Sequence, residues 1–588
     1  MTSPASAISS RYNNRSIFDE REAVCVKILL KGAQVVNVFT DELEKANVLI
    51  SDGVIVGVGD YSEGDADVIE DVSGKYICPG FIDGHIHIES TMLQPAEFAR
   101  VCLPRGTTAV IADPHEIANV SGLMGVAYML EASEGIPMSI YFMMPSCVPA
   151  TPFDEAGAVL TAADVRSMYG LPRILGLGEM MNYPGVLAGD AEVLEKLSAT
   201  REAGLIINGH APMISGRDLD AYIAQGIFDD HECTTIDEAL ERLRRGQWIM
   251  IRQGTAARNL EALLPLFEEP YCRRCLLVTD DKHPADLLRR GHIDSIIREA
   301  AAMGKSPITG IRMATLNAAE RFGLNGTGAV APGYKADLLV LDDLADVRVS
   351  DVYYGGRKVV DCGKTVSFEK PYIRQDVWKA VRNSFYLAAV RENDLRIEPE
   401  SDTCRVIELV PGQLITKNAA MKLDFSRNGG IDTERDILKL AVIERHMDSG
   451  HIGLGFVSGM GLKTGAIASS VSHDSHNLLV VGTNDADMCD AANHIRSIGG
   501  GLAVVKDGEL LAEMPLPIGG LMGKKSAEEM ARLNEEVREA VAKLGVPDGI
   551  EPFMNMAFIS LPVIPSLKMT TTGLVDVDNF CPVPLFVK

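Results

Sequence analysis

The stretch from residue 80 to 321 alternates between short apolar runs and longer helix-like segments, and this alternation restricts the fold more than any other feature. The eight apolar runs lie at 80–87, 107–115, 139–147, 174–180, 205–210, 227–232, 248–254 and 276–281. Near-continuous apolar strands indicate burial on both faces and hence parallel pairing. Eight β-α units in about 240 residues predict an α/β fold with a (β/α)8 TIM-like barrel. An open doubly wound sheet is the alternative, but no Gly-rich phosphate loop follows the first run.

The segments on either side of this stretch predict further domains. Short β-rich runs separated by turn formers occur at 23–79 and again at 322–366, so both could form one small, discontinuous β-sandwich domain. Two separate small sheets are the alternative. We expect a polar N-terminal arm at 1–22, a connecting helical segment at 367–400 and a C-terminal α/β domain at 401–588, with a helix at about 526–544.

Composition excludes several classes of function. The chain has 56 Lys plus Arg against 81 Asp plus Glu, a net charge of −25, which argues against nucleic acid or an anionic membrane as a partner. We find no signal peptide and no apolar run of about 18 residues. The 11 cysteines are an odd, scattered number that suggests reduced thiols. These features predict a cytoplasmic enzyme that acts on a small molecule.

Six of the eight predicted strands end in histidines or carboxylates, which is where a barrel enzyme builds its active site. These residues are His85 and His87, then Asp113, His115 and Glu116, then Glu179, His210, His231 and Asp280. For any single histidine, burial in the core is the simpler explanation. Only 12 histidines occur in the chain, however, and five of them lie at these positions, so a shared function is favoured.

Residues at three of these strand ends have the chemistry of metal ligands. His85 and His87 form a His-x-His motif, and on a strand both side chains point to the same side, where they can bind one cation. Glu179 can bridge two cations about 3.5–4 Å apart through its two oxygens, although an acid at a helix N-terminus is the alternative. Asp280 can bind a metal and accept a proton from a water molecule, with Asp281 expected to support the loop.

Longer motifs connect these residues to a known family. The sequence PGFIDGHIH at 79–87, followed by one Glu, two His and one Asp at strand ends, resembles the metal-dependent amidohydrolase superfamily. The segments HIHIESTML (85–93), LPRGTTAVIADPHEIANV (103–120), GLGEMMNYPGV (176–186), NGHAP (208–212), SHDSHN (472–477) and MAFISLPVIPSLKMTTTGL (556–574) narrow the resemblance to the bacterial adenine deaminase family. It extends from about residue 25 to 588.

The resemblance implies hydrolysis of adenine to hypoxanthine and ammonia with two divalent metal ions, manganese first, with iron or zinc as alternatives. Matched residue by residue, the implied ligands are His85, His87, Glu179, His210, His231 and Asp280. Many relatives bridge the metals with a carboxylated Lys, where this chain offers Glu179. We further expect adenine as the small-molecule partner, no nucleic acid or membrane partner, and a homo-oligomer, specifically a dimer.

Attack on C6 of a purine requires an acid as well as a base. Asp280 is the candidate for taking the proton from water and returning it to the amine, and Glu116 is the candidate for protonating the ring, with Glu89 as its competitor. His115 could orient the nucleophile or the substrate, and Asp113 could fix His115. The alternative for Asp113-Pro114-His115-Glu116 is a proline turn that caps the next helix.

Two further segments could bind substrate. Arg252 and Gln253 end the seventh run and could recognise a purine edge, although a plain loop with a helix cap explains them equally well. In the C-terminal domain, Ser472, His473, Asp474 and His476 form an unusual polar segment. We expect it to close over the barrel mouth and to contact substrate or a further metal, and a turn held by side-chain hydrogen bonds is the alternative.

Two other functions compete with deamination. The first is a different cyclic amidohydrolase, such as a dihydroorotase-like or imidazolone-hydrolysing enzyme. The second is a non-catalytic assembly protein on the same scaffold, in which the ligand residues would have been lost. All six ligand types are present, so the sequence favours an enzyme.

Overall fold

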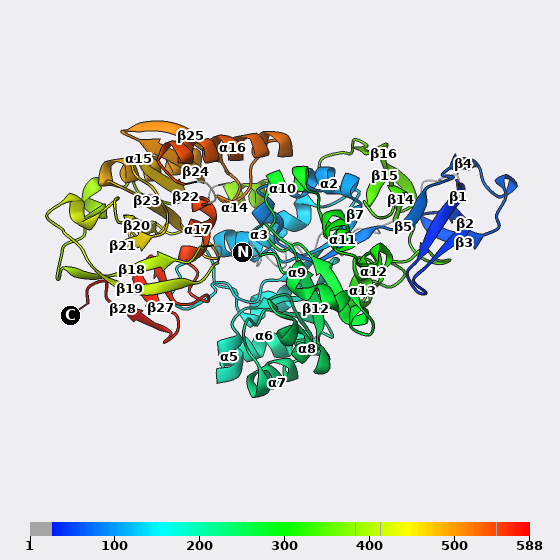
Figure 1. The fold of residues 1–588 in the computed structure, drawn as a ribbon, viewed down its shortest axis with the longest axis horizontal. Helices are drawn as coiled ribbons and strands as arrows, with labels where there is room; N and C mark the ends of the chain where they lie inside the picture. Colours follow the sequence, from blue (N-terminus) through cyan, green and yellow to red (C-terminus); the bar gives the residue numbers. More distant parts are fainter. Residues whose placement is uncertain (1–25, 256, 383, 412, 548–549, 588) are drawn as a thin grey trace.

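A computed structural model describes residues 26–255, 257–382, 384–411, 413–547 and 550–587. Figure 1 shows a sheet at the right end of the molecule, a strand–helix unit in the middle and a second large sheet at the left. The predicted polar arm at 1–22 lies outside the described residues. In the described part of the chain, no helix combines the length and the apolar character needed to cross a membrane.

The middle unit contains a parallel strand at each of the eight predicted positions. They are β6 (Phe81–Ile86), β7 (Thr107–Ala112), β8 (Ser139–Met144), β9 (Ile174–Met180), β10 (Ile206–Gly209), β11 (Asp229–Asp230), β12 (Trp248–Arg252) and β13 (Cys275–Val278). β6 to β10 pair in sequence order, as do β11 to β13. A parallel bridge between Ile86 and Asp280 joins the first strand to the end of the last, so the sheet is curled.

Burial on both faces explains why most of these strands are rich in apolar residues, although β11 consists of two buried aspartates. All six residues of both β6 and β7 are buried. On the inner side, Ile82, Met143, Met250 and Leu276, from four different strands, belong to one apolar cluster. Each strand end is therefore fixed by packing against several neighbours, and a side chain placed there has a defined position.

Helices follow most of the strands and cover the outside of the curled sheet (Figure 1). They are α2 (Pro95–Cys102), α3 (His115–Ala132), α4 (Ala162–Met168), α5 (Tyr183–Ala188), α6 (Ala191–Glu202), α7 (Gly216–Ala224), α8 (Ile236–Arg244), α9 (Leu260–Leu263), α10 (Pro284–Arg289), α11 (Ile293–Ala302), α12 (Pro307–Met313) and α13 (Leu316–Arg321). Local sequence sets their starts. The Thr235 side chain, for example, accepts a hydrogen bond from the Glu238 backbone and begins α8 with a capping box.

Strands from both flanks of the middle unit pair in a single nine-stranded sheet. They are β1 (Ile28–Asn37), β2 (Glu42–Ser51), β3 (Val54–Gly59), β4 (Val68–Asp71), β5 (Tyr76–Pro79), β14 (Leu338–Asp343), β15 (Arg348–Tyr354), β16 (Arg357–Asp361) and β17 (Lys364–Thr365). β5 and β14 join the two flanks as antiparallel neighbours, with Cys78 opposite Leu339. Leu30, Val48, Ile77 and Leu338 pack in the apolar core of this sheet.

The C-terminal region is built on an eight-stranded sheet in the order β19-β18-β21-β20-β23-β22-β24-β25. The strands are β18 (Thr403–Leu409), β19 (Thr416–Lys422), β20 (Ile437–Ile443), β21 (Ile452–Ser458), β22 (Ala466–Ser469), β23 (Leu478–Gly482), β24 (Gly501–Lys506) and β25 (Glu509–Pro515). The remaining elements are α15 (Asp485–Ile498), α16 (Ala527–Lys543), α17 (Pro552–Ile559), β26 (Leu567–Thr570), β27 (Gly573–Asp576) and β28 (Cys581–Val583). The predicted helix at 526–544 corresponds to α16, which Ser526 caps.

The connecting segment is less helical than expected. Within 367–400 the described helices are α14 (Gln375–Arg382) and a short 3-10 turn at Glu392–Leu395. Tyr386 donates its backbone N–H to the Arg445 carbonyl, and Ala388 donates to the Asp448 carboxylate. The segment follows the C-terminal sheet because these backbone groups have partners there, which competes with helical hydrogen bonding.

Candidate active site

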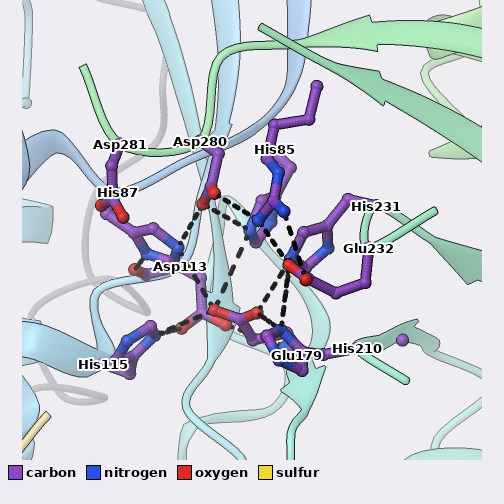
Figure 2. Close-up of polar contacts among 12 residues, drawn as sticks. His85, His87, Asp113, His115, Glu179, His210, His231, Glu232, Asp280 and Asp281 are labelled. Atoms are coloured by element: carbon purple, nitrogen blue, oxygen red, sulfur yellow. Dashed lines mark hydrogen bonds and ion pairs between the residues drawn. The ribbon is translucent and has the colours of Figure 1, made fainter. Parts of the chain in front are cut away.

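The six predicted ligands lie together at the carboxyl end of the curled sheet, as Figure 2 shows. His85 lies in the last two residues of β6 and His87 follows the strand. Glu179 is on β9, and His210, His231 and Asp280 follow β10, β11 and β13. Five of these side chains are buried and His210 is half-buried. The tertiary structure thus gathers groups from five strands, up to 195 positions apart in the sequence.

Glu179 lies between two groups of imidazoles and directs one oxygen at each. Oε2 is 2.7 Å from Nδ1 of His210 and 3.1 Å from Nε2 of His231. Oε1 is 3.2 Å from Nε2 of His87. Burial opposes the charge of Glu179, but its contacts with His210, His231 and His87 hold its pKa well below the ordinary value. The carboxylate is therefore ionised and offers a donor oxygen to each side.

The second set of donors surrounds Asp280. Its Oδ1 is 3.0 Å from Nε2 of His87 and 3.6 Å from Nε2 of His85. Asp280 has a positive φ of 57° and donates its backbone N–H to the His85 carbonyl over 3.0 Å. This unusual backbone conformation turns the carboxylate toward the two imidazoles instead of along the strand.

Hydrogen bonds behind the cluster set the orientation of its imidazoles. His87 donates from Nδ1 to the Asp113 carbonyl over 2.9 Å, so Nε2 faces Asp280 and Glu179 and carries the lone pair when the ring is neutral. His85 Nε2 is buried and has no hydrogen-bond partner in the described part of the chain. A buried nitrogen without a partner, beside two ionised carboxylates, fits a cation ligand.

Asp113 supports Glu179 rather than His115. Its Oδ2 accepts a hydrogen bond of 2.9 Å from the Glu179 backbone N–H. Its Oδ1 is 3.6 Å from Nδ1 of His115, too far for a hydrogen bond. The approach is possible because residue 178 is glycine, since a Cβ there would lie 2.0 Å from Asp113 Oδ2. The carboxylate of Asp113 therefore fixes the position of the Glu179 backbone on β9.

Two residues that were not predicted from the sequence as site residues also contact the cluster. Glu232 lies with Oε1 at 3.3 Å from Nε2 of His231 and 3.7 Å from Nδ1 of His210. Tyr222 accepts a hydrogen bond from the His210 backbone N–H and donates one to the Met180 carbonyl, both over 2.9 Å. Glu232 directly follows a predicted ligand at a strand end, which is a signal that could have identified it.

The side chains of Arg252 and Gln253 are both bound to other protein groups, so neither is directed at an open cavity. Arg252 donates from Nη1 to Asp280 Oδ2 over 2.9 Å and also contacts Glu232, so its guanidinium holds two acids of the cluster. The Gln253 amide donates to Glu299 over 2.8 Å and accepts from the Leu260 N–H over 3.3 Å. The amide of Gln253 is thus engaged in its own loop.

The segment Ser472–Asn477 reaches the middle unit from the C-terminal sheet. His473 Nδ1 lies 2.6 Å from Oε1 of Glu116, and His476 Nε2 contacts the other oxygen of the same carboxylate. Asp474 Oδ1 is 3.8 Å from Nε2 of His115. The Ser472 hydroxyl instead pairs with Ser560 within the C-terminal region. The structure therefore brings three residues of this segment to α3.

A cavity opens between the middle unit and the C-terminal region. Its lining includes Glu89, Glu116, Asp281, His473 and Phe558. Glu89 follows the predicted ligand His87 by two positions and Asp281 follows Asp280 directly, so the cavity adjoins the cluster of predicted ligands. Burial raises the pKa of Glu89 to about 7, and its Oε2 is buried without a partner in the described residues.

The arrangement can bind divalent cations and move protons beside them. Imidazole nitrogens and carboxylate oxygens are ligands for divalent transition metals. His85, His87 and Asp280 form one group of converging donors, and His85, Glu179 and His231 form another. The cavity next to them carries groups that can donate and accept protons.

Comparisons with known proteins agree with this geometry. Residues 76–360 match the amidohydrolase family model, and residues 413–581 match the adenine deaminase C-terminal domain. The chain is 48% identical to adenine deaminase 2 of Carboxydothermus hydrogenoformans over 95% of its length and 96% of the relative. It is 47% identical to the adenine deaminase of Desulfatibacillum aliphaticivorans, over 95% of this chain and 97% of the relative.

Among solved structures, a β-aspartyl dipeptidase of Fervidobacterium islandicum AW-1 aligns with 58% of this chain and 99% of its own, at 17% identity and a TM-score of 0.47. The near full-length sequence similarity to curated relatives is far stronger. It includes the middle unit with the ligand cluster and the C-terminal region that contacts it. This chain belongs to the adenine deaminase family of amidohydrolases.

Proposed function

We propose that this protein hydrolyses adenine to hypoxanthine and ammonia. The observation that carries the proposal is Glu179, whose two oxygens face separate imidazole groups beside a cavity lined with acidic and basic side chains. Relatives named adenine deaminase, 45–48% identical over nearly the whole chain, support adenine as the substrate. A substrate of this kind is neutral and planar, which suits a cavity next to a cluster of ionised groups.

We propose two divalent cations in the cluster. His85, His87 and Asp280 would hold one, His210 and His231 the other, and Glu179 would bridge them. Manganese is the first candidate, with iron or zinc as alternatives, because all three accept mixed nitrogen and oxygen ligands. When bound, the cations supply Lewis acidity, which makes a nucleophile available from water at neutral pH.

Asp280 is proposed as the residue that accepts the proton of the attacking water. Arg252 holds its Oδ2, so Oδ1 remains directed at the ligand cluster. After attack on C6, the same carboxyl group would return the proton to the departing amine, which leaves as ammonia. Arg252 fixes the rotation of the carboxylate and keeps it ionised between turnovers.

The purine ring needs a proton donor while C6 becomes tetrahedral. The cavity presents three carboxyl groups, those of Glu89, Glu116 and Asp281. Asp281 accepts a hydrogen bond from the Ser90 hydroxyl, which leaves Glu89 and Glu116 as the candidates. Both oxygens of Glu116 are engaged by His473 and His476, whereas Oε2 of Glu89 is buried without a partner among the described residues. We therefore propose Glu89 as the direct donor to the ring, and we place Glu116 behind it as a supporting group.

The fold that carries this chemistry is proposed to be a closed (β/α)8 barrel at 80–321. The parallel bridge from Ile86 to Asp280 supports closure. A small discontinuous domain at 23–79 and 322–366 and a C-terminal domain at 401–588 would flank it. The pairing of β5 with β14 supports the discontinuous domain.

The test is an assay of metal-depleted and manganese-reloaded protein. We expect chelation to abolish ammonia release from adenine and Mn²⁺ to restore it, with iron and zinc compared in parallel. Adenosine, cytosine and dihydroorotate serve as competing substrates, since ring opening of dihydroorotate without adenine deamination would favour the cyclic amidohydrolase alternative. Full adenine deamination by metal-free protein would contradict the proposed chemistry.

A further inference from the structure

The imidazole of His473 is fixed by contacts at one face and one edge of the ring. The residue belongs to the C-terminal region, whereas the predicted ligands belong to the middle unit. Its ring stacks on Phe558, with centroids 4.6 Å apart and 18° between the planes. Its Nδ1 hydrogen-bonds to Glu116 Oε1 over 2.6 Å, and its backbone N–H donates to the Ala557 carbonyl over 2.8 Å. Its Nε2, on the opposite edge of the ring, makes no hydrogen bond to any described residue, and the side chain lines the cavity.

The other histidine of the segment has a fixed protonation state. The Ser472 backbone N–H points at His476 Nδ1 over 3.2 Å, so this nitrogen accepts and Nε2 must carry the hydrogen. Nε2 therefore donates to Glu116 Oε2 and is not free to bind a metal. Burial lowers the pKa of His476 to about 4, which keeps its ring neutral. The three side chains thus form a carboxylate held by two imidazole N–H groups rather than a third cation site.

The charges around His473 favour a protonated ring. Burial lowers its pKa, but Glu116, Asp281 and Asp474 raise it more, to about 9. At neutral pH the ring then donates from both nitrogens, from Nδ1 to Glu116 and from Nε2 toward the cavity. A buried carboxylate behind an imidazole fixes its orientation, as in catalytic dyads that hold a histidine toward a substrate.

We propose that His473 binds the substrate, donating a hydrogen bond from Nε2 to one ring nitrogen of the purine, and that Glu116 and His476 act through it as positioning residues. The inference rests on the proposed function, because it concerns how the same cavity recognises adenine. It assigns the C-terminal region a direct part in substrate recognition. It also explains why Glu116 is buried between two histidines instead of facing the purine itself.

The experiment compares adenine with 1-deaza-, 3-deaza- and 7-deazaadenine, each of which replaces one ring nitrogen by CH. Affinity is measured on manganese-loaded protein, as KM for adenine and as inhibition constants for the analogues. In wild type, we expect one analogue to bind about 10- to 100-fold more weakly than the others, as for a lost hydrogen bond to a charged group. In His473→Ala, this difference should disappear.

Two further variants separate recognition from a structural role. Glu116→Gln should weaken adenine binding, and combining it with His473→Ala should add little, because both changes remove the same contact. His494→Ala is the matched control, since this half-buried histidine of α15 pairs with Glu513 of β25 in the same region, and neither residue lines the cavity. It should leave the preference among the analogues unchanged. Thermal unfolding of every variant checks the fold.

Each result decides the question. If His473→Ala weakens adenine and all three analogues by the same factor, or weakens none, His473 makes no ring contact and the inference fails while the proposed function stands. If wild type neither deaminates nor binds adenine by calorimetry, both fail together. Selective loss for a single analogue, absent in the His494 control, supports it.

Discussion

At the scale of single residues, the most informative group is Glu179. A carboxylate with imidazoles on both sides can bridge two cations, and one buried imidazole nitrogen near it has no hydrogen-bond partner among the described residues. This nitrogen is Nε2 of His85, which lies 3.9 Å from Glu179 Oε1 and 3.6 Å from Asp280 Oδ1. Unpaired buried polar atoms are costly, so their presence here indicates a cluster built for a charged occupant.

Glu179→Gln should therefore lower the metal content of the protein. The amide keeps one acceptor oxygen but replaces the other with NH₂, which cannot bind a cation. We expect elemental analysis to show a fall from two equivalents of metal per chain to one or fewer, with loss of adenine deamination.

Glu195→Gln, on the exposed side of α6, is the control and should keep both equivalents. Unchanged metal content in the Glu179 variant would rule out bridging.

At the scale of elements, β9 shows how a strand positions a functional group. Gly178 allows Asp113, which follows β7 on the far side of β8, to approach the backbone of β9 and to accept the hydrogen bond from Glu179. The apolar pattern of the strand determines which residues face the core. The hydrogen bond from the Glu179 backbone to Asp113 determines the position from which the Glu179 carboxylate extends. A small residue at this position is thus part of the site.

Gly178→Ala should distort the site more than it destabilises the fold. Its Cβ would lie 2.0 Å from Asp113 Oδ2, so the carboxylate or the strand must move. We expect a loss of about 1–3 kcal/mol in the free energy of unfolding. Because small displacements of reacting groups are costly, kcat/KM for adenine should fall by about 100-fold.

Gly64→Ala is the matched control, because the only atom near its Cβ would be Ser62 Oγ at 3.7 Å. It should change neither quantity. Equal kcat/KM for Gly178→Ala and wild type would show that Asp113 does not position Glu179.

At the scale of the whole molecule, a buried ion pair joins the C-terminal sheet to the middle unit. Burial opposes the charge of Glu116, but His473 and His476 hold its pKa well below the ordinary value, and Glu116 raises that of His473. Asp281 and His283 face His473 from the loop after β13, and Asp474 and His476 face it from its own segment. The association of the two regions should therefore depend on pH.

The sign of this dependence follows from the direction of each shift. The pKa of His473 rises on folding from 6.5 to about 9, so its contribution is complete below about pH 6.5 and is lost as pH rises through 9. That contribution is about 3 kcal/mol. The contribution of Glu116 is present above about pH 4.5 and is lost on acidification.

We expect the melting temperature of wild type to fall between pH 6.5 and pH 9.5 more steeply than that of His473→Asn, measured on manganese-loaded protein. His494→Asn should follow wild type. Parallel curves for wild type and His473→Asn would show that this pair does not stabilise the association.

Several features could be predicted from the sequence because they depend on local pattern. The eight strands occur in the predicted order, since near-continuous apolar runs can only be buried on both faces. The family and the polar residues at strand ends could be identified from contiguous sequence motifs. Cytoplasmic location and a homodimer stay predictions.

Only the tertiary structure could decide the contacts between distant segments. Asp113 accepts a hydrogen bond from Glu179 and not from His115, and Arg252 pairs with Asp280. His473 hydrogen-bonds to Glu116, which lies 357 positions earlier in the sequence. Periodicity and motifs determine which strand a side chain belongs to and which end it occupies. They do not determine its nearest partner, because that depends on the curl of the sheet and on how the C-terminal region packs against it.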